Sequence, residues 1–160
     1  MADIKEKFGT SNQAITCTLA SLANNAARQA TEVDNATNLF LDALVFLKVK
    51  TGASGVTASG AVYIYAYATV DGGTTRTENA GATDAAITLT VPTNARLVGI
   101  VNAVAVAVTY LGGPFSVAAA FGGTLPEKWG LIIENRTGGA LDATEANHAK
   151  IYQGVLSQSV

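Results

Sequence analysis

The stretch Val62-Tyr63-Ile64-Tyr65-Ala66-Tyr67-Ala68-Thr69-Val70 lies near the middle of the chain and is followed by Asp71-Gly72-Gly73. Tyrosines occupy alternate positions, and small or branched residues stand between them. Because successive side chains of a strand point to opposite faces of a sheet, the pattern predicts a β-strand with tyrosines on one face and apolar residues on the other. The Asp-Gly-Gly sequence predicts a turn that ends the strand. We interpret the stretch as part of a β-sandwich with an aromatic outer face.

A second long strand is predicted over Leu39–Lys50, where alternation and β-branched residues outweigh the helix preference of Leu, Ala and Lys. One face is apolar throughout, and the other carries Phe40, Asp42, Leu44, Phe46, Lys48 and Lys50. That second face is too hydrophobic to face water, so we expect a loop, a partner subunit or the N-terminal segment to cover it. A covered carboxylate needs a partner, since an unpaired buried charge is costly. We expect Asp42 to pair with Arg28, Arg96 or a lysine near the N-terminus.

Turn signals divide the rest of the chain into short segments, about eight to ten strands in all. The further predicted strand segments are Ile15–Leu22, Ala27–Val33, Ile87–Val91, Arg96–Val101, Ala103–Tyr110, Glu127–Glu134, Ala143–Ala149 and Ile151–Leu156, with Phe115–Phe121 either a strand or a short helix. Gly112-Gly113-Pro114 predicts a turn. Long amphipathic helices are lacking. The sequence therefore predicts an all-β, antiparallel, jelly-roll-like β-sandwich over residues 14–160, preceded by an N-terminal arm over residues 1–13.

The composition predicts a subunit of an assembly. Charged residues make up 14% of the chain, against about 25% in ordinary globular proteins, and 49% are hydrophobic. We expect a homo-oligomer, a trimer or a dimer, that covers part of this surface; the alternative is a monomer coated in Ala, Thr, Ser, Asn and Gly. With a net charge of −2 and no basic run, we expect no nucleic-acid partner. The apolar run Leu97–Leu111 is too short to span a bilayer, so we expect no membrane partner.

Residues that carry chemistry are scarce. The one histidine, His148, and the one cysteine, Cys17, are far apart in sequence, so we predict no catalytic triad, no metal site and no cofactor. We interpret His148 as a surface residue and Cys17 as a small buried hydrophobe. Two groups of carboxylates remain, namely Asp71, Glu78 and Asp84, and Glu134, Asp142 and Glu145. They lack the spacing of a calcium loop, and a hydrolase would need two of them about 5–10 Å apart in a cleft. We therefore predict that the protein is not an enzyme.

Aromatic residues allow two interpretations. Tyr63, Tyr65, Tyr67, Phe115, Phe121 and Trp129 could together form a platform that stacks on sugars. Rows of aromatics on a strand more often serve packing or a protein interface, and we favour that interpretation. The candidate interface residues are Phe40, Asp42, Phe46, Tyr63, Tyr65 and Tyr67.

Six segments of the chain carry a resemblance to a known group of proteins, namely Ala27–Asn35, Asp42–Val45, Val62–Gly73, Pro114–Ala118, Trp129–Leu131 and Leu141–His148. With these segments, the chain between residues 15 and 156 resembles small virion proteins of tailed bacteriophages. The resemblance implies a structural subunit that is made in the cytoplasm of a bacterial host and built into the virion. The role that it implies first is a capsid decoration, or cement, protein that stabilises the head by bridging copies of the major capsid protein. The alternatives are a neck, tail or fibre protein, or a carbohydrate-binding adhesin module.

Overall fold

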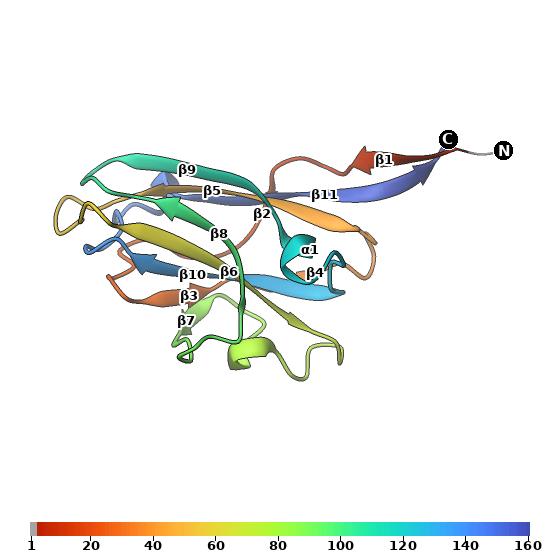
Figure 1. Ribbon diagram of the computed structural model, residues 1–160, viewed down its shortest axis with the longest axis horizontal. Coiled ribbons are helices and arrows are strands. Elements are labelled where there is room, and N and C mark those ends of the chain that lie inside the picture. The colour runs from red at the N-terminus through yellow and green to blue at the C-terminus, as the bar shows by residue number, and fades with distance from the viewer. Residues whose placement is uncertain (1–2) are drawn as a thin grey trace.

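The computed structural model describes residues 3–160 as two antiparallel β-sheets packed face to face (Figure 1). Sheet A contains β1 (Ile4–Phe8), β2 (Gln13–Ala14), β11 (Ala149–Ser159), β5 (Asp42–Lys50) and β9 (Thr109–Ser116). Sheet B contains β7 (Ala85–Ile87), β3 (Ala27–Gln29), β4 (Val33–Asp34), β10 (Lys128–Arg136), β6 (Ala61–Thr69) and β8 (Arg96–Asn102). Three short helical segments lie between strands, η1 (Thr77–Asn79), α1 (Val117–Ala120) and η2 (Glu145–Asn147). The predicted all-β antiparallel sandwich is thus confirmed, while residues 1 and 2 of the expected arm lie outside the described residues.

The strands pair as if the chain were one long antiparallel hairpin. β2 pairs with β11, β3 with β10, β5 with β9, and β6 with β8. Successive pairs alternate between sheet A and sheet B, so the hairpin is rolled up into the sandwich. No helix within residues 3–160 is long and apolar enough to cross a membrane.

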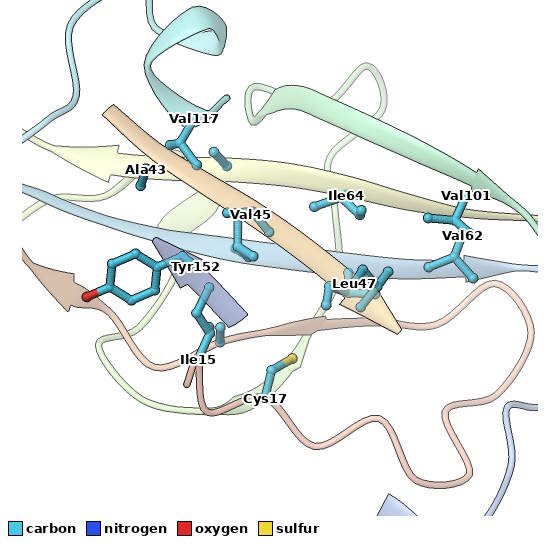
Figure 2. Packing of buried hydrophobic residues seen from close by; sticks show 14 of the residues in the cluster. Ile15, Cys17, Ala43, Val45, Leu47, Val62, Ile64, Val101, Val117 and Tyr152 are labelled. Carbon is cyan, nitrogen blue, oxygen red and sulfur yellow. The ribbon is translucent and has the colours of Figure 1, made fainter. Parts of the chain in front are cut away.

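The inner core fills the space between the two sheets (Figure 2). Alternate residues of β5 and β6, such as Val45 and Ile64, point into it and are fully buried. Trp129 of β10 and Tyr152 of β11 meet edge to face with ring centroids 5.5 Å apart, an arrangement that the aromatic quadrupole favours. The two-residue alternation that predicted these strands therefore also predicts the core.

The predicted strand Ile15–Leu22 keeps its alternation but is not a strand. Ile15 and Cys17 are buried and the threonines beside them are exposed, yet the backbone joins no regular ladder. The N–H of Thr18 donates to the Asp84 carboxylate and the N–H of Leu19 to the Glu145 carboxylate. Side chains thus replace the neighbouring strand as partners. The expectation for Cys17 is confirmed, and burial raises the pKa of its thiol to about 12.

The sequence between β8 and β9 corrects two further expectations. Most of Ala103–Tyr110, predicted as a strand, is the loop that connects β8 to β9. Gly112-Gly113-Pro114, predicted as a turn, lies inside β9. The pairing of β9 with β5 shifts register between Val45 and Leu47, and Gly113 has a φ of 113° there. Glycine in a strand often marks such a bulge, so Gly112-Gly113-Pro114 forms a bulge inside β9 in place of the predicted turn.

The two chain ends form a ribbon that extends beyond the sandwich (Figure 1). The pairing of β11 with β5 stops at Val155, so residues 156–160 pair with β1 on one side only. Every described residue from 3 to 8 is exposed. We call residues 3–8 and 156–160 the terminal ribbon. Its strands leave both outer edges without a neighbour in the described chain, and such two-stranded pieces are marginally stable alone.

Candidate interaction surfaces

The three tyrosines of β6 lie on the outer face of sheet B, as predicted, but they differ in exposure. Tyr67 is 0% exposed and its hydroxyl donates to the Ala30 carbonyl at 2.8 Å. The residues that pack around it include Ala80, from the loop between β6 and β7, and Ala95, from the segment before β8. Burial also raises the pKa of Tyr67. As a correction, Tyr67 is a core residue beneath its own chain and is not available as an interface residue.

Tyr63 and Tyr65 remain half-buried on the same face. Their rings are nearly parallel, at an interplanar angle of 13° and a centroid distance of 6.3 Å. The six-residue sugar platform does not assemble, because Trp129 lies in the inner core while Phe115 and Phe121 pack against it from its margin. Of the three tyrosines of β6, Tyr63 and Tyr65 keep exposed surface.

Phe40 and Phe46 are both half-buried, but they lie on opposite faces of sheet A. As a correction to the prediction, Phe40 precedes β5 and packs against the inner core, while Phe46 points outward. The Phe40 ring rests on backbone, since a Cβ on Gly154 would lie 2.4 Å from the ring. Glycine at this position therefore allows the ring to cover β11. Phe46 lines a small hollow together with Pro114 of β9. The outer face of sheet A thus keeps Phe46 half-exposed, and a contact of Phe40 or Phe46 with a partner stays a prediction.

Asp42 has a different partner from the one expected. Its Oδ1 accepts hydrogen bonds from the N–H of Ala118 at 2.8 Å and of Ala43 at 2.7 Å. The carboxylate thus satisfies a free N–H at the start of α1, where side-chain acceptors are favoured. Arg28 instead forms an ion pair with Asp84 at 2.5 Å, and Arg96 is exposed. The predicted ion pair of Asp42 with an arginine is wrong.

The carboxylates that could have supported a hydrolase or a calcium site are bound to their own chain. Asp71 accepts hydrogen bonds from the Thr69 hydroxyl and from the N–H groups of the following turn. Asp142 binds Asn147, Thr144 and Lys50. Glu145 accepts hydrogen bonds from Leu19, Ala20 and Lys150. Hydrogen bonds from Thr69 and from Asn147 hold the pKa of Asp71 and of Asp142 well below the usual range. Within residues 3–160, no group of three His, Cys, Asp or Glu side chains could hold a metal ion. These carboxylates stabilise loops.

His148 is buried, which corrects its interpretation as a surface residue. Its Nδ1 accepts from the N–H of Lys50 at 3.3 Å, and its Nε2 lies 3.1 Å from the Asp142 carbonyl oxygen. A neutral ring with the proton on Nε2 satisfies both contacts. His148 therefore ties β5 to the loop before β11.

A groove on the outer face of sheet B contains a buried carboxylate. We call it the Glu134 groove; it measures about 670 Å³ and is lined by residues 25–27, Tyr65, residues 86–93, Glu134 and Arg136. Arg136 Nη2 lies 2.8 Å from Glu134 Oε1. The Tyr65 hydroxyl donates to Glu134 Oε2 across a longer distance of 3.4 Å. Burial and the Glu134 carboxylate raise the pKa of Tyr65. The floor of the groove is thus an aromatic ring beside an ion pair.

Glu78 holds the wall of the Glu134 groove. This buried residue accepts hydrogen bonds from the N–H and the hydroxyl of Thr90, both at 2.8 Å, from the Thr93 hydroxyl at 2.8 Å, and from the N–H of Asn94. Burial alone would raise the pKa of Glu78, but these hydrogen bonds outweigh it and lower the pKa to about 2. Sequence reasoning missed this role, although the density of Thr and Asn donors after Glu78 was its signal.

A second surface is aliphatic. Its exposed side chains are Leu97, Ile100, Val104, Val106, Val108 and Leu111, from β8, the following loop and β9, and we call them the aliphatic rim. Leu97 and Ile100 pair with tyrosines and lie on the outer face of sheet B, whereas Leu111 pairs with Lys48 and lies on the outer face of sheet A. Since β8 contacts β9, the rim runs around this side of the sandwich from one sheet to the other. Gly99 and Gly112 permit this approach, because a Cβ on either would overlap Phe115 or Val101. The chain from residue 97 to residue 126 contains no charged residue at all, a signal that sequence reasoning used only to assess membrane spanning.

The described surface thus offers three features, namely the Glu134 groove, the aliphatic rim and the terminal ribbon. Comparison with protein families, with curated proteins and with solved structures finds no match to this chain.

Proposed function

We propose that this chain is a non-enzymatic structural subunit of a tailed-phage virion, and first of all a capsid decoration protein that bridges neighbouring capsid subunits. The observation that carries the proposal is the aliphatic rim, whose Leu111 is 63% exposed in a stretch without charges. Exposed apolar patches of this kind mark interaction sites. Burying one such side chain contributes about 1.5–3 kcal/mol, so a few of them support a stable contact.

We also propose that the sandwich is a jelly roll. Four strand pairs of one long hairpin alternate between the sheets, which supports this architecture. Jelly rolls occur in viral capsid and lectin domains. The fold is therefore compatible with the virion role and also with the adhesin alternative.

The terminal ribbon supports a bridging role. Its four paired positions, Ile4–Lys7 with 156–159, extend over about 13 Å at the usual rise of a strand, with both edges free to add a strand. Ile4 and Phe8 stand on the same face of the ribbon and are exposed. A neighbour that pairs with the ribbon gains backbone hydrogen bonds as well as apolar contact. Several weak contacts of this kind add up through effective concentration.

Light scattering after gel filtration tests the self-association. We expect a trimer or a dimer for the unmodified chain. Val106→Lys and Leu111→Lys introduce charges into the aliphatic rim and should shift the mass to that of a monomer. Val70→Lys is the matched control, since Val70 is fully exposed but outside the rim, and it should leave the mass unchanged. A monomer at every concentration, or rim variants that assemble normally, would contradict the proposal.

Mass spectrometry and labelled electron microscopy of purified tailed-phage particles test the location. We expect many copies of the chain on the outside of the head. Copies at the neck, tail or fibres would instead support those alternatives, and particles without the chain would contradict a virion role.

A further inference from the structure

We propose that the Glu134 groove binds a neutral carbohydrate, a ring with several hydroxyl groups. This inference does not rest on the virion role, since it uses only the geometry of the outer face of sheet B. The Glu134 carboxylate is the group that we expect to accept a hydrogen bond from the ligand. The Glu134 side chain is only 6% exposed, Arg136 binds its Oε1, and its Oε2 has the 3.4 Å contact with Tyr65. That distance is well beyond the usual 2.7–2.8 Å of an O–H···O bond, so Oε2 can accept a stronger hydrogen bond from a ligand hydroxyl.

The charge of the groove favours a neutral ligand. Glu134 and Arg136 are the two charged residues of its lining, and they neutralise each other. An anion would meet the carboxylate, and a cation would meet the guanidinium. A hydroxyl group can donate to the first and accept from the second, since it is both donor and acceptor.

The rest of the lining matches the two-sided chemistry of a sugar ring. Ile87, Leu89 and Pro92 provide an apolar wall for C–H groups, while Thr88 and Asn25 are polar. Ligand sites usually combine a mostly apolar lining with a few polar groups, in volumes of about 300–1,000 Å³. The groove lies within that range, with 670 Å³.

The wall is also fixed in place before any ligand arrives. Glu78 holds Thr90, Thr93 and the N–H of Asn94. A loop that is already ordered loses less entropy on binding, which raises affinity. The groove is therefore built by a buried carboxylate on each side, Glu134 in the floor and Glu78 behind the wall.

Saturation-transfer NMR with methyl glycosides of glucose, galactose, mannose, rhamnose and N-acetylglucosamine tests the inference. We expect transfer to at least one of these sugars. When a ligand hydroxyl binds Glu134 Oε2, the Tyr65 hydroxyl beside it is free to bond the same ligand group. Tyr65→Phe removes this bond and should weaken binding about tenfold, the loss of one hydrogen bond to a ligand. Thr88→Val should weaken binding without any change to the buried ion pair.

Tyr63→Phe is the matched control, because Tyr63 is on the same strand but does not line the groove. It should bind like the unmodified chain. If circular dichroism shows that Glu134→Gln folds, this variant should abolish saturation transfer. If it does not fold, the binding measured for Tyr65→Phe and Thr88→Val tests the inference. The inference is overturned if no sugar of the panel receives saturation, or if binding is the same in both the Tyr65→Phe and the Thr88→Val variants.

Discussion

The outer faces of the two sheets differ in what covers them. On sheet B the loop between β6 and β7 folds back, so Tyr67 is fully buried, with Ala80 of that loop and Ala95 of the segment before β8 packed around it. On sheet A the outward side chains of β5, Phe46 among them, stay half-buried. Both strands showed a two-residue alternation in sequence. The difference teaches that alternation identifies a face that is covered, but not whether the chain or a partner supplies the cover.

The largest expected effect comes from removing the cover of sheet B. Tyr67→Ala leaves a cavity beneath the loop and should lower the free energy of unfolding by about 3–5 kcal/mol, as for other buried aromatic residues. Phe46→Ala, on the half-buried face of sheet A, should cost clearly less. Urea denaturation of both variants measures the difference.

Tyr67→Phe is the control for the ring itself. It keeps the packing and removes the hydrogen bond to Ala30, so it should cost about 1 kcal/mol. If Tyr67→Ala and Phe46→Ala lost the same free energy of unfolding, the outer faces of sheets A and B would be covered to the same extent. That result would contradict the difference in cover between the two sheets.

The next effect concerns the loop behind the Glu134 groove and depends on pH. The pKa of Glu78 is about 2 in the folded chain, below its ordinary value of 4.5. Because the pKa of Glu78 is lowered in the folded chain, its contribution to the free energy of unfolding is complete above pH 4.5 and is lost as the pH falls towards 2. Glu78→Gln should cost about 1–3 kcal/mol at neutral pH.

Urea denaturation at several pH values measures this contribution. The gap in unfolding free energy between the unmodified chain and Glu78→Gln should shrink as the pH falls through that window. Glu127→Gln is a suitable control, since Glu127 is exposed. A gap that does not change with pH would mean that the Glu78 carboxylate does not hold the loop.

The sequence predicted the strands better than their partners. Alternation in β5 and β6 identified both faces of each strand, because the period of two is a local property of the backbone. The partner of Asp42 could not be predicted, since the N–H of Ala118 becomes free only where α1 starts, far along the chain. The Glu134 groove had no local signal either, because Tyr65 and Glu134 come from different strands and meet through the pairing of β6 with β10.

A smaller effect is expected on the inner face of sheet A, where Phe40 covers Gly154 at the margin of the core. Phe40→Ala exposes this part of β11 and should cost about 1–2 kcal/mol, since the ring is only half-buried. Gly154→Ala places a Cβ against the ring and should also be destabilising.

The two changes should not add. In the double variant the added Cβ meets no ring, so the loss from Gly154→Ala should be smaller than in the unmodified background, a coupling of about 0.5–1 kcal/mol or more. Denaturation of the four chains of this cycle measures the coupling. Strict additivity would show that the ring does not lie on Gly154.

The smallest effect on stability is expected for the terminal ribbon. Deleting residues 1–8 removes β1, whose described residues are exposed and pair only with the end of β11, so the free energy of unfolding should fall by less than about 1 kcal/mol. Deleting residues 1–14 also removes β2 from the edge of β11 and should cost more. If the shorter deletion cost as much as Phe40→Ala, the ribbon would contribute to the stability of the sandwich as Phe40 does. If instead it leaves stability intact but lowers the mass of the assembly in light scattering, then the chain ends, unlike the loop over Tyr67, serve contacts outside the subunit.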